Sequence, residues 1–192
     1  MKSTFLTLFV LGIIFSCTRS KVEQSDQDEK EILFLKEVLV DTTILKHQFT
    51  FSDIDVNPPS MLNIPGDTTF TRGIDYIAYL LDEKDTLFLR SQFVQEKGFT
   101  LKSLASDIFK IIPVSDFRRS KISTDSLWNY IRRNRLDGYY SLSMPIFSKD
   151  NKKAYLKISY QCEGHCGNGI EILFIKVNNQ WRVKERFGGW VN

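Results

Sequence analysis

Residues 153–177 read KAYLKISYQCEGHCGNGIEILFIKV, and this stretch decides the fold. Its first part alternates between polar Lys153, Lys157 and Gln161 and the apolar side chains of Ala154, Leu156, Ile158 and Tyr160. A period of two predicts an antiparallel strand with one wet face. Residues 170–177 are apolar on both faces except at Glu171 and Lys176, so we expect them to form the most buried strand.

Two further segments extend this hairpin into a sheet. Residues 140–146 and 180–184 alternate in the same way, with inward Tyr140, Leu142, Met144 and Ile146 in the first and Trp181 and Val183 in the second. Asn178 and Asn179 suit a type I′ turn because asparagine tolerates a positive φ, and residues 149–152 suit another hairpin turn. Pro145 cannot donate to a ladder, which places its strand at an edge or the proline at a bulge. The pattern predicts a four-stranded meander.

The first half of the chain predicts mostly helices. Residues 29–40 have helical spacing at Ile32, Leu35, Val38 and Leu39. Residues 74–81 form an apolar run that favours a strand. A helix then follows, with Asp82 as its N-cap and with Leu87, Phe88, Ser91 and Val94 on its inner face.

Shorter segments complete the assignment. We expect a strand at residues 49–51, a loop at 57–71 and an extended segment at 110–114. A helix after Ser123 or Thr124 places Leu127, Trp128 and Ile131 inside and ends before Gly138. The sequence therefore predicts an α+β fold, with an antiparallel C-terminal β-meander packed against helices from the N-terminal half.

The N-terminus carries an export signal. Lys2 precedes an apolar run from Phe5 to Phe15, and the small Ser16 stands before Cys17. Such a pattern is typical of a cleaved signal peptide. The run is shorter than the roughly 20 residues that span a bilayer. We expect a signal peptide at residues 1–16, a tether at 17–30 and a single α+β domain at 31–192.

The residues Ile14, Phe15, Ser16 and Cys17 resemble the lipobox of bacterial lipoproteins. The resemblance implies that the Cys17 thiol carries a diacylglycerol, that a peptidase cuts before Cys17, and that the new amine is often acylated. Two or more acyl chains anchor a protein firmly. The chain is thus expected to be held on a membrane of the cell envelope, facing the periplasm or the cell surface.

The loop Cys162-Glu-Gly-His-Cys166 admits three interpretations. We favour a disulfide, because these two cysteines are the only ones left once Cys17 is acylated, and exported proteins meet an oxidising compartment. A metal site with His165 lacks a fourth ligand, and the only other histidine is His47. Free thiols are the third interpretation, although the spacing differs from that of thioredoxin-like motifs. We expect neither a metal nor a cofactor.

The last 50 residues or so are similar to a group of uncharacterised bacterial lipoproteins. The similarity lies in the turn at residues 147–150, the Cys-x-x-x-Cys-Gly-x-Gly loop at residues 162–169, and Trp181 in the last strand. The group implies no activity.

Composition and motifs narrow the function classes. The chain has 26 basic and 23 acidic residues and a formal net charge of +3, which is too small to indicate a nucleic-acid-binding protein. The basic run at residues 132–135 suits a helix C-terminus. Tyr139, Tyr140, Tyr155 and Tyr160 suit the core or cross-strand pairs.

The sequence has no hydrolase, zinc-protease or phosphate-loop motif. We therefore expect a non-catalytic binding or structural domain whose partners are the membrane and an envelope protein or small ligand. The alternative is a hydrolase-like envelope enzyme.

Overall fold

The computed structural model describes residues 29–41, 44–45, 50–53, 69–94, 101–119, 124–164 and 166–191. The predicted signal peptide, Cys17, most of the predicted tether, His47 and His165 lie outside the described residues. Within the described ranges, no helix has the length and apolar character needed to cross a membrane.

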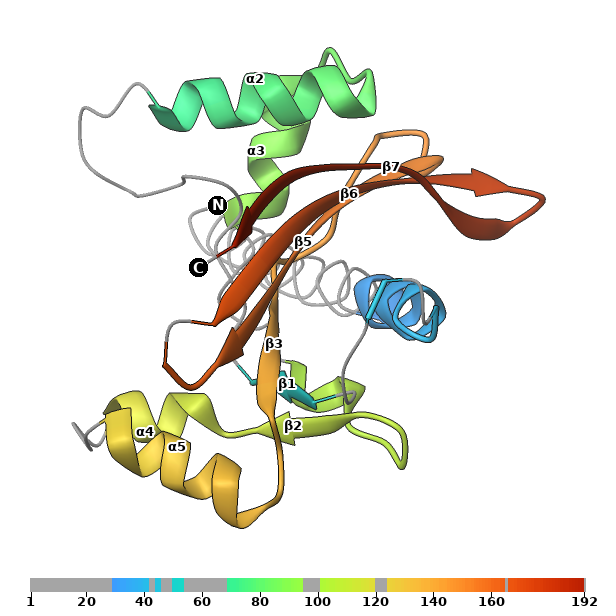
Figure 1. The fold of residues 1–192 in the computed structure, drawn as a ribbon. Helices are drawn as coiled ribbons and strands as arrows, with labels where there is room; N and C mark the ends of the chain where they lie inside the picture. Colours follow the sequence, from blue (N-terminus) through green and yellow to red (C-terminus); the bar gives the residue numbers. More distant parts are fainter. Residues whose placement is uncertain are drawn as a thin grey trace, which may run out of the picture.

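A mixed sheet of seven strands forms the centre of the molecule (Figure 1). Its order is β2-β1-β3-β5-β6-β7, and the short β4 also pairs with β5. β1 is parallel to β2 and β3, whereas all other neighbours are antiparallel. The strands are β1 (Thr50–Ser52), β2 (Lys110–Ile112), β3 (Gly138–Leu142), β4 (Ile146–Phe147), β5 (Lys153–Cys162), β6 (Gly167–Val177) and β7 (Gln180–Val191). The α+β class and its antiparallel C-terminal strands are confirmed.

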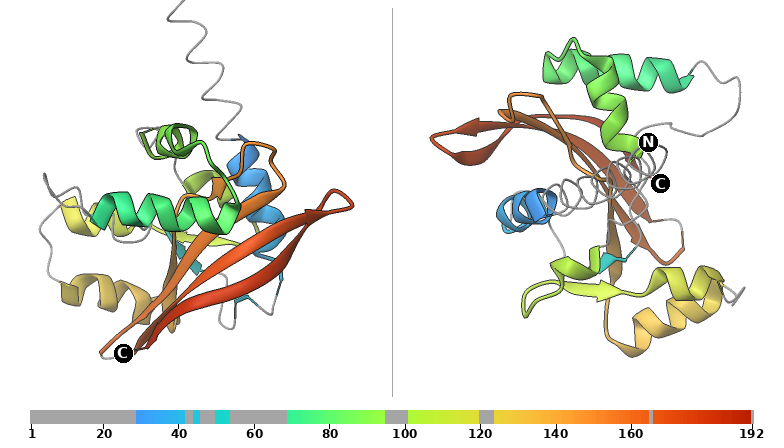
Figure 2. Two further views of the ribbon diagram at one scale, coloured as in Figure 1. Left: turned by 90° about the horizontal axis from the view of Figure 1, so that it is seen from above. Right: turned by 180° about the vertical axis from the view of Figure 1, so that it is seen from behind.

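Helices cover both faces of the sheet (Figure 2). The inner face, formed by residues such as Leu156, Ile158 and Phe174, packs against a helix over residues 29–38. The outer face is the opposite side of the same strands. It packs against α2 (Thr69–Leu81) and α3 (Thr86–Val94) at one end, and against α4 (Val114–Arg119) and α5 (Thr124–Arg133) at the other. A short 3-10 helix, η1 (Leu101–Leu104), joins the inner core.

Burial on two faces corrects the expectation of one wet face. Tyr155 on the outer face is fully buried against α2, and its neighbours Ala154 and Leu156 are fully buried on the inner face. β5 is therefore more buried than residues 170–177, and the prediction that these residues form the most buried strand was wrong. In residues 170–177 only Ile172, Leu173 and Phe174 are buried.

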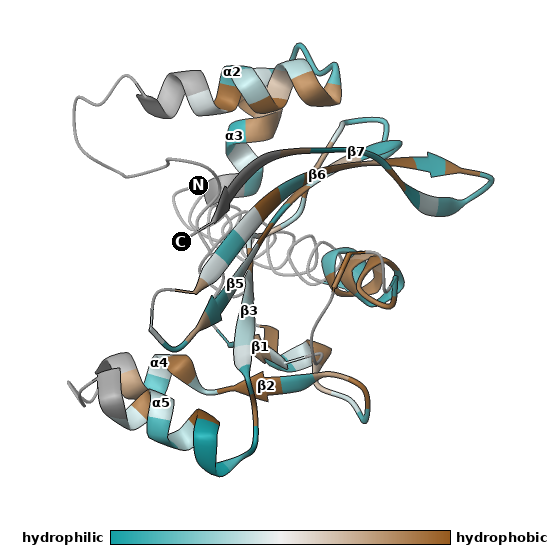
Figure 3. Ribbon diagram, viewed as in Figure 1, coloured by the Kyte–Doolittle hydropathy of each residue, from teal (hydrophilic) through white to brown (hydrophobic). Residues whose placement is uncertain are grey.

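The segment 74–81 is a helix, not the strand that its apolar run favours. Ile74, Ile77, Ala78 and Leu81 lie on one side of α2 and face the sheet, whereas Tyr79 is 81% exposed. Figure 3 shows hydrophobic residues of α2 turned toward the sheet. Spacings of three and four place these side chains on one helix face, so the helical period decides over the β propensity of isoleucine and tyrosine.

The cap of the next helix also differs from the prediction. Asp82 ends α2 with a left-handed φ of 53°. Asp85 is the residue that caps α3, because its Oδ1 accepts the Phe88 backbone N–H at 2.9 Å. Of the predicted inner face, Phe88 is partly buried against the outer core, but Leu87 is 77% exposed and Ser91 is exposed. Leu89 and Gln92 are buried in their place.

The segment 140–146, predicted as one strand, is broken into β3 and β4. Pro145 lies in the break, where its missing N–H leaves no gap in a ladder. β4 pairs with β5, and the Gln92 side chain of α3 takes the place of a second neighbouring strand. Its Nε2 donates to the Phe147 carbonyl and its Oε1 accepts the Phe147 N–H, both at 2.9 Å. One side chain thus satisfies both polar groups of a buried backbone unit.

Other local predictions are confirmed. Asn178 and Asn179 join β6 to β7 with φ values of 51° and 62°, as a type I′ turn requires. Leu127 and Ile131 of α5 are buried. Arg132 and Arg133 occupy the last turn of that helix.

Candidate functional site

A groove of about 430 Å³ lies where the helix over residues 29–38 passes the edge strand β7. We call it the β7 groove. Residues on the helix and just after it form one wall, and the two strands of the β6–β7 hairpin form the other: Glu37, Val38, Val40, Asp41, Ile44, Phe174, Gln180, Trp181, Arg182 and Val183. This volume lies in the usual range for ligand pockets.

The groove combines an apolar lining with charged groups on its walls. Val38 is buried, Ile44, Trp181 and Val183 are half-buried, and Val40 is 51% exposed. Glu37 and Asp41 supply carboxylates on the helix wall, while Arg182 supplies a cation on β7. A few polar groups around an apolar lining are the usual composition of a binding site.

Trp181 is held rigidly at the floor of the groove. Its ring meets the Phe34 ring edge-on at 5.1 Å between centroids, and Lys176 Nζ lies 5.4 Å from the ring. Its backbone N–H donates to Glu37 Oε1 at 2.6 Å. The helix and the edge strand are therefore joined at the Trp181 backbone through one carboxylate.

A second hollow of about 410 Å³ lies between the α2–α3 link and the β4–β5 turn. Its charged groups are paired with one another: Lys149 Nζ lies 3.0 Å from Asp85 and Lys153 Nζ lies 3.4 Å from Asp82. Glu83 accepts the backbone N–H groups of Lys149 and Asp85, which hold the pKa of Glu83 below its usual range. Since these charges already have partners, we interpret this hollow as a contact that holds the two turns together and not as a binding site.

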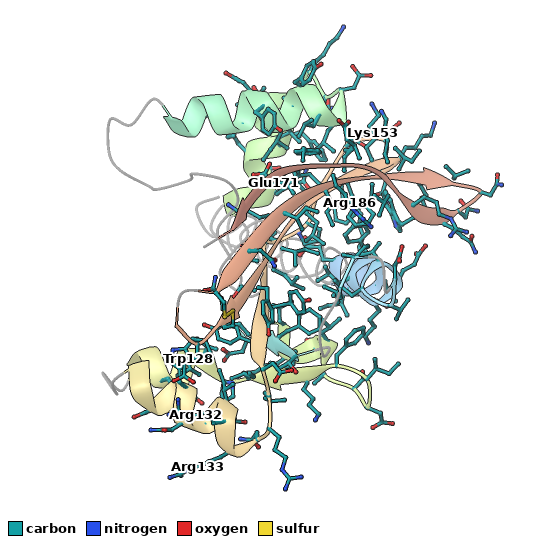
Figure 4. All side chains as sticks on the ribbon, viewed as in Figure 1. Trp128, Arg132, Arg133, Lys153, Glu171 and Arg186 are labelled. Carbon is teal, nitrogen blue, oxygen red and sulfur yellow. A yellow bond between two sulfur atoms is a disulfide. The ribbon has the colours of Figure 1, made fainter. Side chains whose placement is uncertain are left out.

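The outer face contains a polar cluster that sequence reasoning missed. Glu171 of β6 lies opposite Lys157 of β5 and Phe187 of β7. Figure 4 shows Glu171 on the side of the sheet that faces α2 and α3. Burial raises the pKa of the Glu171 carboxyl, and this shift is opposed by the Tyr155 hydroxyl and by the charge of Lys157. Burial also raises the pKa of Tyr155, and the Glu171 charge adds to that shift.

The cysteine loop lies at the tip of the β5–β6 hairpin, near α5 (Figure 4). The structure joins Cys162 and Cys166 as a disulfide with Cα atoms 5.5 Å apart. Gly164 takes a φ of 83°, and Glu163 forms an ion pair with Arg132 of α5. The described residues include no group of three or more histidine, cysteine or acidic side chains that could hold a metal ion. His165, on which the metal interpretation depends, lies outside them.

The remaining residues singled out from the sequence lie away from the groove. Tyr139, Tyr140, Tyr155 and Tyr160 are all buried, and the Tyr140 and Tyr160 rings form a cross-strand pair with centroids 5.0 Å apart. The predicted strands contribute five lining residues to the groove: Phe174, Gln180, Trp181, Arg182 and Val183. The groove itself could not be predicted, because Glu37 on its helix wall and Trp181 on its strand wall are 144 positions apart in the chain.

The comparisons with known proteins give no relative. No protein family, no curated protein and no solved structure matches the chain.

Proposed function

We propose that the chain is a lipid-anchored protein of the bacterial envelope whose folded domain is a non-catalytic binding module. The observation that carries the anchor is the apolar run that ends at Ser16 and Cys17. The pairing of Cys162 with Cys166 is consistent with export, since disulfides persist in oxidising compartments. It also leaves Cys17 as the one unpaired cysteine among three.

The β7 groove supports the binding role. It is open, its apolar residues are held by a packed aromatic floor, and the carboxylates of Glu37 and Asp41 lie on its helix wall. An envelope protein or a small ligand is the partner that such a site suits. The anchor would hold the domain at a membrane surface, and the groove would take the partner there.

Replacement of Cys17 by serine tests the anchor. We expect Cys17→Ser to accumulate as an uncleaved precursor or a soluble protein that takes up no labelled fatty acid. Cys166→Ser is the matched control and should still be processed and acylated. A Cys17→Ser protein that still fractionates as a processed membrane protein would show the proposal to be wrong.

The same preparation tests the disulfide in the exported protein. Mature, unreduced wild-type protein should contain no thiol that iodoacetamide can alkylate, as measured by intact mass. Two alkylated thiols would contradict the disulfide, and bound zinc in that sample would favour the metal interpretation.

Glu171 favours a second candidate function, a hydrolase-like envelope enzyme. A half-buried carboxyl with a raised pKa is suited to act as a general acid. Wild-type protein and Glu171→Gln should be compared on chromogenic esters and glycosides. Turnover that the glutamine variant loses would favour the enzyme, and no turnover by the wild type would remove it.

A further inference from the structure

We infer that the β7 groove takes an extended peptide, which adds to the edge strand β7 as a further strand of the sheet. The inference rests on the proposed binding role and names the class of its partner. The peptide has alternating side chains: apolar and basic residues face the helix wall, and acidic residues face away from it.

The backbone of β7 offers hydrogen bonds at this edge. Val177 and Gln180 flank the two-residue turn, and Trp181 pairs with Lys176 in the next position. Hydrogen-bonded and non-hydrogen-bonded pairs alternate along an antiparallel ladder. The Trp181 N–H therefore points away from β6, as its bond to Glu37 shows. Val183 pairs with Phe174 two positions further along, directly before the bulge of this ladder, so the same alternation also turns the Val183 N–H outward.

Glu37 occupies the position of a strand carbonyl. Its Oε1 accepts the Trp181 N–H at the edge where an added strand would place its own acceptor. An incoming peptide displaces this carboxylate from the backbone. Glu37 then remains beside the peptide as a negative charge, which favours a basic side chain at that point.

The groove lies under this edge and supplies the space for side chains. In a strand, alternate residues point to opposite faces. Those on the helix side enter the hollow between Val38, Ile44 and Val183, with the Glu37 and Asp41 carboxylates on its wall. Residues on the other side lie next to Arg182, which favours acidic side chains there.

A second copy of β7 is a poorer occupant than such a peptide. Within residues 180–184, where the added strand would pair, the charged side chains are Arg182 and Lys184, which are both exposed. Pairing two copies edge to edge would bring like charges onto neighbouring positions, which is unfavourable. Charge complementarity therefore favours a partner with acidic residues on that side.

A synthetic peptide tests the inference. The probe is acetyl-EVEKEVE-amide with a fluorescent label, titrated by anisotropy into the full chain in detergent micelles. We expect saturable binding, with slower amide exchange at residues 180–184 by mass spectrometry. The control peptide has N-methyl groups on the amides that would face β7. It should bind about tenfold more weakly or worse, because it lacks the backbone donors.

Two exposed apolar residues provide matched variants of the protein. Val40→Arg places a cation in the groove and should weaken peptide binding about tenfold by repelling the lysine. Leu33→Arg changes a 59% exposed residue of the preceding helix that does not line the groove, and should leave binding unchanged. Val183→Pro removes an outward donor on an edge strand, where proline is tolerated, and should abolish exchange protection.

Three outcomes would overturn the inference: no binding of the probe, equal binding of the N-methylated peptide, or equal loss in Val40→Arg and Leu33→Arg. Self-association of the chain that protects residues 180–184 would also overturn it, since a second copy would then be the occupant. None of these results bears on acylation of Cys17, so failure of the peptide inference and failure of the anchor are distinguishable.

Discussion

The inner and outer faces of the sheet differ in how they are filled. The inner face is a continuous apolar surface under the helix over residues 29–38 and η1, and Ile172 and Phe174 are typical of it. The outer face has apolar contacts at its two ends, under α2 and under α5, with the buried Ser159 and the half-buried Lys157 and Glu171 between them. Alternation in a sequence identifies the more buried face of a strand, but it does not show that the other face is exposed to solvent.

Two neighbouring residues of β6 test whether both faces are core. Ile172 points inward and Leu173 points outward, and they are 0% and 2% exposed. Ile172→Ala and Leu173→Ala should each lower the free energy of unfolding by about 2–5 kcal/mol, the usual cost of removing a buried aliphatic side chain. Denaturant titration measures both values.

An exposed residue of the neighbouring strand sets the scale. Arg182→Ala should change the free energy of unfolding by no more than about 0.5 kcal/mol. If Leu173→Ala lowered the free energy of unfolding as little as Arg182→Ala, the outer face would not be core, and α2 would not exclude water from it.

The inner face could be predicted from the sequence because its signal is local. Leu156, Ile158 and Tyr160 alternate with polar residues, and the two asparagines at 178–179 define the hairpin. The helix α2 could not be predicted from its own residues, because Ile74, Ile77 and Leu81 fit a helix while isoleucine and tyrosine equally favour a strand. The apolar stripe identifies this segment as a helix only once Tyr79 is known to be exposed.

The candidate site depends on long-range contacts, and the sequence carries little signal for it. Glu37 and Trp181 are 144 positions apart, and only the packed fold brings the carboxylate to the strand edge. Glu171 is visible in the sequence as a charge within an apolar strand, but its burial depends on packing against α2, part of which the sequence favours as a strand. Cys162 and Cys166 are the exception, because their separation of four residues is itself local.

The next largest effect on stability is expected where Gln92 of α3 hydrogen-bonds to β4. Gln92→Leu keeps the bulk of the side chain but leaves the Phe147 N–H and carbonyl without their partner. We expect a loss of about 1–3 kcal/mol, which is the cost of a buried polar group left unsatisfied. The free energy of unfolding and the exchange rate of the Phe147 amide are the measurements.

Gln92→Glu separates hydrogen bonding from packing. The carboxylate still accepts the Phe147 N–H but can no longer donate to its carbonyl while ionised. A variant that is as unstable as Gln92→Leu at neutral pH and recovers in acid would agree with this account. Equal stability of Gln92→Leu and wild type would mean that α3 does not complete the outer layer.

The smallest expected effect concerns Glu171 on the outer face. Burial raises the pKa of its carboxyl in the folded protein above the value in the unfolded chain. Between those two pKa values the folded state binds more protons than the unfolded state, so stability falls as the pH rises. Above the folded pKa the destabilisation is complete and constant. Glu171→Gln removes the charge and should therefore match the wild type in acid but exceed it in stability at neutral pH.

Glu83 provides a control of opposite sign. Two backbone N–H groups hold its pKa below the usual range, so its contribution is present at neutral pH and is lost as the pH falls through the lowered value. Glu83→Gln should thus be less stable than the wild type at neutral pH and approach it in acid. Urea titrations of the three proteins from about pH 4 to 8 would give two difference curves of opposite slope. A flat curve for Glu171 would mean that its carboxyl is as well solvated in the folded as in the unfolded protein, and the outer face would then be open to water between α2 and α5.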